Sequence, residues 1–236
     1  MSEAPAAGRG RRRALALFLL VATLVFAGLA VWQVERRSEK LALIARVEAR
    51  IHAEPVAPPP PAAWPSITRS GDEYRRVHVT GRYLAYPGTP VKAVTERGPG
   101  YWLLAPLETD AGFTVYVNRG FVPALPPEAA HAPRGPVTVT GLLRMTEPGG
   151  GFLRSNDPAA GRWYSRDVAA MASAAGLANV APYFVDAFEV TPPEPDGPVT
   201  GLTVVRFANN HLVYVLTWAA LAVMSLALLV RLRRFG

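Results

Sequence analysis

Two apolar stretches at the ends of the chain decide the fold. They are Ala14–Trp32, ALALFLLVATLVFAGLAVW, and Leu212–Val230, LVYVLTWAALAVMSLALLV, and neither contains a charged residue. A helix rises about 1.5 Å per residue, so about 20 such residues cross a hydrocarbon core about 30 Å thick. Both stretches are too long for the strands of a membrane barrel. We therefore predict transmembrane helices over residues 14–34 and 212–230.

The basic residues lie beside these stretches. The formal net charge is +7, and the tail formed by residues 1–13 carries four arginines against Glu3, a net +3. The tail formed by residues 231–236 adds three arginines. This is the positive-inside pattern of a membrane protein, whereas a nucleic-acid-binding protein needs its cations on a folded surface. We expect both tails in the cytoplasm of a bacterium, the middle of the chain in the periplasm, and no nucleic-acid partner.

A cleaved signal peptide is the alternative for the first stretch. Small residues, Gly28 and Ala30, lie near its end, as they do before cleavage sites. The apolar run is longer than the usual signal core of about 7–15 residues, which favours a retained helix. The first helix is followed by Arg36 and Arg37. Basic residues therefore lie on both sides of the first helix and give only a weak signal for its orientation. The second helix, with arginines concentrated after its end, indicates the topology more clearly.

Residues 35–65 connect the first membrane helix to the domain. Leu41, Ile44, Val47 and Ile51 recur at helical spacing, so Glu35–Glu54 is expected to continue as a juxtamembrane helix. The stretch from Pro55 to Pro65 is dense in proline. We expect it to form an extended, semi-rigid spacer without helix.

Residues 66–211 are expected to form one extracytoplasmic domain of mainly β structure, in the α+β class. Short alternating runs are separated by glycine and proline clusters, which is typical of a small barrel or sandwich. One alanine-rich helix is expected at Ser165–Ala175, and Asp110-Ala111-Gly112 is a candidate hairpin turn. The predicted strands are Tyr74–Tyr83, Val91–Thr95, Tyr101–Leu107, Phe113–Phe121, Val137–Met145, Tyr183–Val190 and Leu202–Arg206.

Signatures of catalysis are missing from the sequence. The chain has no cysteine, which excludes disulfides and thiolate chemistry. It contains no nucleophile elbow, phosphate loop or zinc-protease motif. His52, His78 and His131 are scattered, and His78 lies in an alternating strand where it should face solvent. We therefore expect a protein that is not an enzyme.

His211 is the candidate ligand of the chain. It lies at the start of the second membrane helix, with Tyr214 and Trp218 on the same face. One interpretation is an interfacial belt at headgroup depth. The other is a haem site, in which the imidazole binds iron, the two aromatic rings wall the macrocycle, and Arg206, Arg36 or Arg37 pairs with its propionates. Spacing alone leaves both open.

Several blocks of residues occur in order from about residue 29 to residue 218. The most distinctive block is Val117-Asn118-Arg119-Gly120 with Val122-Pro123. The other blocks are Trp32-Gln33 with Arg36, Lys40, Leu43 and Ile44, Tyr74–Gly81, Gly100-Tyr101 to Pro106-Leu107, Asn156 with Pro158, Trp163 and Asp167, and Asn209–Tyr214 with Thr217-Trp218. Through this ordered set the chain resembles the surfeit locus protein 1 family, whose members are assembly factors of haem–copper cytochrome c oxidase. One departure is Phe121, where the family more often has tryptophan.

The resemblance implies a role in maturing the oxidase's catalytic subunit, with haem a bound transiently through His211. Haem a synthase and the catalytic subunit are the implied protein partners, beside the lipid bilayer. The alternative is a membrane scaffold that stabilises an assembly intermediate without touching haem. The residues Tyr101, Asn118, Arg119 and Gly120 are candidates for a partner-binding surface. They could equally serve only to shape a strand end.

Overall fold

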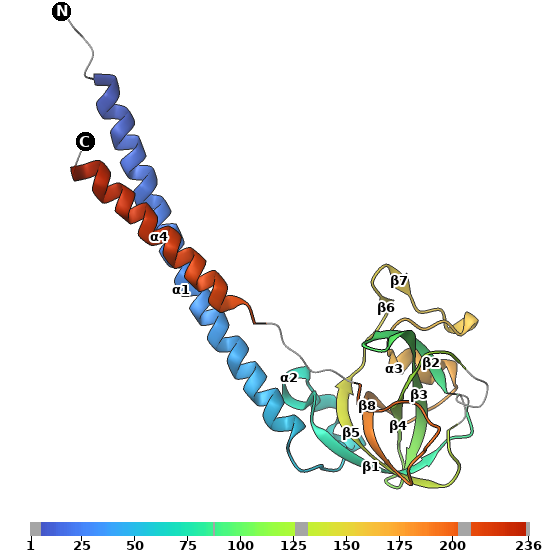
Figure 1. The fold of residues 1–236 in the computed structure, drawn as a ribbon. Coiled ribbons are helices and arrows are strands. Elements are labelled where there is room, and N and C mark those ends of the chain that lie inside the picture. Colours follow the sequence, from blue (N-terminus) through green and yellow to red (C-terminus); the bar gives the residue numbers. More distant parts are fainter. Residues whose placement is uncertain (1–5, 87, 126–131, 203–208, 235–236) are drawn as a thin grey trace, which may run out of the picture. The chain divides into compact units, whose positions relative to one another are not determined.

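The computed structural model describes residues 6–86, 88–125, 132–202 and 209–234, with side chains from residue 10 onward. The chain forms two compact units, which Figure 1 shows as a ribbon. Residues 1–46 and 206–236 form the first, here called the helical unit. Residues 47–205 form the second, here called the β domain.

The helical unit consists of two long helices, α1 (Ala6–Ile51) and α4 (His211–Arg234), of which α1 runs on into the β domain. Both are long and apolar enough to cross a membrane. Large apolar side chains such as Leu17 (63% exposed) and Val213 (64% exposed) lie open along them. Exposed apolar surface of this extent needs lipid to cover it. The protein is a membrane protein, as the two apolar stretches predict, and α1 continues beyond the first stretch as the spacing predicted.

The β domain is built on a six-stranded sheet with the order β1-β5-β8-β4-β3-β2. An additional pairing of β1 with β3 closes five of these strands into a barrel. Of the two predicted alternatives, a barrel or a sandwich, the domain is therefore a barrel. The pair β4–β8 is parallel and the other pairs are antiparallel. The strands are β1 (Arg76–Tyr83), β2 (Thr89–Thr95), β3 (Gly98–Thr109), β4 (Thr114–Val122), β5 (Pro136–Met145) and β8 (Val180–Thr191).

Two apolar cores lie on the two faces of this sheet. Alternation along each barrel strand puts valines such as Val77, Val115 and Val139 in one core together with Tyr183. The second core includes Tyr116 and Phe184, and it is covered by the short helix α3 (Val168–Ala174). This helix begins later than the predicted Ser165, because Asp167 caps it by accepting a hydrogen bond from the N–H of Ala170.

The proline-rich segment differs from the extended, helix-free spacer that was predicted. It is not a free spacer: Pro61–Ser66 form the 3-10 helix η1, and Val56 forms a parallel bridge with Val77 of β1. The indole N–H of Trp64 and the hydroxyl of Tyr183 both donate to the carbonyl of Pro59, at 3.1 and 2.7 Å. The segment belongs to the β domain because Trp64 and Ile67 pack against the barrel core.

Smaller elements complete the β domain. The turn at Asp110-Ala111-Gly112 joins β3 to β4 as predicted. Of the seven predicted strands, Leu202–Arg206 lies largely outside the described residues, and Leu202 itself is not in a strand. The remaining elements are α2 (Arg69–Asp72), β6 (Gly150–Gly151), β7 (Arg154–Ser155) and η3 (Pro158–Ala160).

Candidate functional site

His211 is held by a residue of the other helix. Its ring nitrogen Nδ1 lies 2.7 Å from Oε1 of Gln33 in α1, and Gln33 is only 8% exposed. An amide oxygen can only accept a hydrogen bond, so Nδ1 is the donor, and in the neutral form of the ring Nε2 carries the lone pair. A histidine held in this way through one nitrogen is the usual arrangement of a metal ligand.

The contact is one of a series between the two helices, which lie side by side in Figure 1. Seven residues before Gln33, Phe26 stacks on Trp218, with ring centroids 5.7 Å apart and planes 23° apart. Trp218 is in turn seven residues after His211. A seven-residue repeat on both helices marks one continuous antiparallel seam. The seam therefore holds the candidate ligand and an aromatic ring together.

The remaining predicted residues of the haem site are less engaged. Tyr214 is 52% exposed, and Arg36 pairs with Glu39 of its own helix at 2.7 Å. Arg37 is half-buried and forms no ion pair with any described residue. Arg206 lies outside the described residues. Close in sequence to His211, the buried Oδ1 of Asn209 finds no hydrogen-bond donor in the described part of the chain.

These residues fit a haem iron held by one protein ligand. A neutral imidazole at His211 would supply the bond to iron, and aromatic side chains would pack on the flat macrocycle. A further polar atom, Oδ1 of Asn209, still lacks a partner within the described chain. No three His, Asp or Glu side chains of the described residues gather as a possible metal cluster elsewhere.

The Asn118-Arg119-Gly120 motif lies inside the β domain. Asn118 (2% exposed) is in β4 beside Asp186 (3% exposed) of β8, and its amide donates to Oδ1 of Asp186 at 2.8 Å. Its own amide oxygen accepts a hydrogen bond from the N–H of Gly120 at 3.2 Å. Asn118 therefore ties the motif's backbone to a buried carboxylate.

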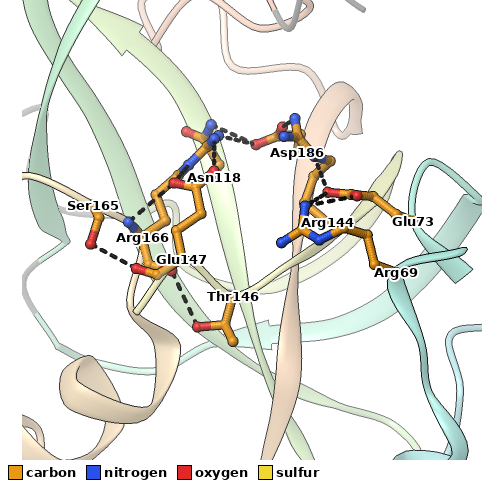
Figure 2. Close-up of polar contacts among 9 residues, drawn as sticks. All are labelled: Arg69, Glu73, Asn118, Arg144, Thr146, Glu147, Ser165, Arg166 and Asp186. Atoms are coloured by element: carbon orange, nitrogen blue, oxygen red, sulfur yellow. Dashed lines mark hydrogen bonds and ion pairs between the residues drawn. The ribbon is translucent and has the colours of Figure 1, made fainter. Parts of the chain in front are cut away.

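Asp186 is the centre of a group of charges that we call the ion network, shown in Figure 2. Arg144 and Arg166 donate to its two oxygens at 2.9 and 3.3 Å. Three cations balance three carboxylates, which is the condition for keeping charge in a protein interior. The members are Arg69, Glu73, Arg144, Glu147, Arg166 and Asp186.

Arg119 points to other partners. It is 2% exposed, forms an ion pair with Glu194, and lies over the ring of Tyr83 at 5.8 Å. Neighbouring residues on a strand face opposite ways, which separates Arg119 from the ion network. Since Asn118, Arg119 and Gly120 are buried, their contacts lie within the domain, and direct binding of a partner to them stays a prediction. Tyr101 is half-buried and lines a surface pocket.

Replacing Gly120 by alanine is expected to cost more than about 4 kcal/mol of folding free energy. Its φ is +131°, and a Cβ would lie 2.5 Å from the carbonyl oxygen of Val199. That carbonyl belongs to a reciprocal hydrogen-bonded pair between Phe121 and Val199, 2.9 Å in each direction. Chemical unfolding of the full chain in detergent, followed by tryptophan fluorescence, measures the loss.

Gly112 is the matched control, because its φ is +80° and a Cβ there would meet nothing within 4 Å. Gly112→Ala should cost only the backbone strain of about 1–2 kcal/mol. Equal losses in the two variants would contradict the close approach of Val199 as the cause.

Acid is expected to destabilise the β domain partly through Glu147. Burial works to raise the pKa of its carboxyl, but two hydrogen bonds and the charge of Arg166 outweigh this and hold the pKa below its ordinary 4.5. A lowered folded-state pKa gives stability that is present above pH 4.5 and is lost as the pH falls through the lower value. Unfolding midpoints of Glu147→Gln should therefore depend less on pH below 4.5 than those of wild type. Parallel curves would contradict the assignment.

Sequence reasoning missed several residues of these sites. Gln33 had a usable signal, because Phe26 and Gln33 repeat at the same interval as His211 and Trp218. Asp186, Arg144 and Arg166 had none, because only the strand order brings them together.

The chain is similar to known proteins over most of its length. The model of the SURF1 family matches residues 20–223. Surfeit locus protein 1 of Mus musculus is 36% identical over 225 residues, covering 86% of this chain and 71% of the mouse protein. That of Homo sapiens is 37% identical over 228 residues, covering 87% and 73%. A SURF1-like protein of Monosiga brevicollis is 34% identical over 252 residues, covering 100% and 94%.

Proposed function

Because the chain belongs to the SURF1 family, we propose that it is an assembly factor of haem–copper cytochrome c oxidase that carries haem a. The family resemblance supports the oxidase as the target. In this proposal haem a synthase supplies the haem, and the catalytic subunit of the oxidase receives it. The protein acts as a carrier and performs no catalysis on its cargo.

The observation that carries the proposal is the pairing of His211 with Gln33. A ring nitrogen fixed at 2.7 Å by a buried amide oxygen leaves the other nitrogen ready to bind iron. A single histidine ligand suits a carrier, because the haem has one protein bond to iron to break when it is released. Trp218, stacked on Phe26, supplies an aromatic surface about two helical turns further along the same seam.

The arginines at the helix ends support the proposed topology. Arg11, Arg12 and Arg13 lie in the first turns of α1, and Arg231, Arg233 and Arg234 lie in the last turn of α4. By the positive-inside rule, these charges support our proposal that both ends lie in the cytoplasm and that the helices cross a bacterial inner membrane. The β domain and His211 then lie on the periplasmic side. A reporter fused to either terminus tests this placement.

The test of the carrier is the haem content of the purified protein. The full chain is expressed together with the enzymes of haem a synthesis, purified in detergent, and its visible spectrum is recorded. We expect haem a at close to one per chain. A preparation free of haem under these conditions would contradict the carrier and leave the scaffold, which needs no cofactor, as the function.

A further inference from the structure

A small hairpin of the β domain presents two apolar side chains to solvent. Strands β6 (Gly150–Gly151) and β7 (Arg154–Ser155) pair, and Phe152 and Leu153 form the tip between them. These side chains are 92% and 88% exposed, the highest values among the large apolar residues of the described domain. Leu153 has φ +56°, a conformation that bulky residues rarely adopt. Such exposure of adjacent large apolar residues indicates a contact surface.

The base of the hairpin is braced against the domain. The N–H of Gly149 donates to the carboxylate of Asp167 at 3.0 Å. Asn156, directly after β7, accepts hydrogen bonds from the N–H groups of Tyr164 and Ser165 at 2.8 and 3.2 Å. A Cβ on Gly150 would lie 2.2 Å from the carbonyl oxygen of Arg154, so the two strands meet as closely as glycine allows. The tip is therefore held outward by a built support.

Arg154 also lines a cationic pocket of about 430 Å³. Lys92 enters it from β2, and both cations lie over the ring of Tyr164, at 5.6 Å for Lys92 and 5.4 Å for Arg154. They are the only charged residues among the lining residues that the structure describes. Val94, 85% exposed, extends the apolar surface on the pocket's rim. The pocket suits an anion, and its surroundings suit hydrocarbon.

Together these features match the interface of a bilayer with anionic lipids. Exposed apolar side chains enter the boundary of the acyl chains, tyrosines suit the headgroup depth, and cations bind lipid phosphates. The bilayer crossed by α1 and α4 is tethered to the domain by the chain itself, so its effective concentration is high. A separate partner protein has no such advantage.

We propose that Phe152 and Leu153 insert into this bilayer and that the pocket formed with Lys92, Arg154 and Tyr164 binds the phosphate of an anionic phospholipid. The site would be a third membrane attachment of the chain, beside its two helices. This attachment does not require haem, so its test is independent of the test of the carrier function.

The test uses the absence of cysteine in the full chain. Ser155→Cys, in the hairpin, is labelled with a fluorophore, and the protein is placed in nanodiscs that contain a headgroup nitroxide lipid as quencher. One set of discs contains phosphatidylcholine alone, and the other also contains phosphatidylglycerol. The control label is at Ala111→Cys, an exposed position in the turn after β3. The start of β3 lines the pocket, so this turn lies at the other end of the strand.

We expect strong quenching at position 155 in the phosphatidylglycerol discs and little at position 111. Each exchange, Lys92→Gln or Arg154→Gln, should lower the docked fraction about fivefold. The double variant Phe152→Ser with Leu153→Ser should abolish docking. All four substituted side chains are exposed in the domain, so these variants should still fold. Three results would overturn the proposal: no quenching at 155, equal quenching in both kinds of disc, or quenching that survives the serine variant.

Discussion

Replacing His211 by alanine is expected to abolish the copurification of haem a with the full-length chain. The imidazole is the proposed protein ligand to iron, and alanine has no atom that can replace it. The measurement is the haem-to-protein ratio from the visible spectrum, after coexpression with haem a synthesis. Wild type should retain close to one haem per chain and His211→Ala almost none.

Two other histidines provide matched controls. His78 faces solvent in β1, as the sequence predicted, and His52 is exposed and contacts Glu48 at 3.1 Å. His78→Ala and His52→Ala should therefore retain the wild-type haem content. If His211→Ala also retained it, His211 would not be the ligand, whatever the wild-type stoichiometry.

A variant of Gln33 tests the positioning of the imidazole separately from its binding to iron. Gln33→Leu removes the acceptor for Nδ1 but leaves the imidazole in place. Loss of such a supporting hydrogen bond typically weakens metal binding about 10–100-fold. Haem titration of the apoprotein should therefore show weaker binding for Gln33→Leu than for wild type, and Gln33→Glu, which keeps an acceptor, should recover part of it. Unchanged affinity in Gln33→Leu would contradict the positioning role.

Asp186→Asn is expected to lower the unfolding free energy by about 3–5 kcal/mol. The carboxylate is 3% exposed and neutralises Arg144 and Arg166, whose side chains are only 13% and 14% exposed. Asparagine can still form hydrogen bonds but leaves the two guanidinium groups with one negative charge fewer. Chemical unfolding of the full chain in detergent measures the effect.

The control for Asp186→Asn is Asp157→Asn. Asp157 also forms an ion pair, with Arg162, but both side chains are exposed to water, which supports the charges when the pair is removed. Its unfolding midpoint should stay close to that of wild type. Similar losses in the two variants would show that burial of the ion network does not matter.

The ion network changes how the Asn118-Arg119-Gly120 motif is understood. Asn118 connects the motif to Asp186, and Arg119 forms a separate buried pair with Glu194. Gly120 permits the close approach of Val199. The three residues thus join β4 to three other parts of the β domain. Changes at the motif are expected to act first through the stability of the barrel.

Features that depend only on neighbouring residues could be predicted from the amino-acid sequence. Length and apolarity were sufficient for the two membrane helices, because the thickness of a bilayer sets both requirements. Alternation located six strands, and the position of His211 at the start of an apolar helix marked it as a candidate ligand. The juxtamembrane helix followed from spacing of the same kind.

Contacts between residues far apart in the chain could not be predicted, because they depend on how the strands and helices pack. Closure of the barrel through β1 and β3, and the parallel pairing of β4 with β8, place Asn118 beside Asp186 and bring together the six charges of the ion network. The proline-rich segment joined the domain because Trp64 found a core to pack against. Gln33 met His211 because two helices far apart in sequence pack in one register. Strand order and helix register depend on the packing of the whole chain, and no local stretch of residues encodes them.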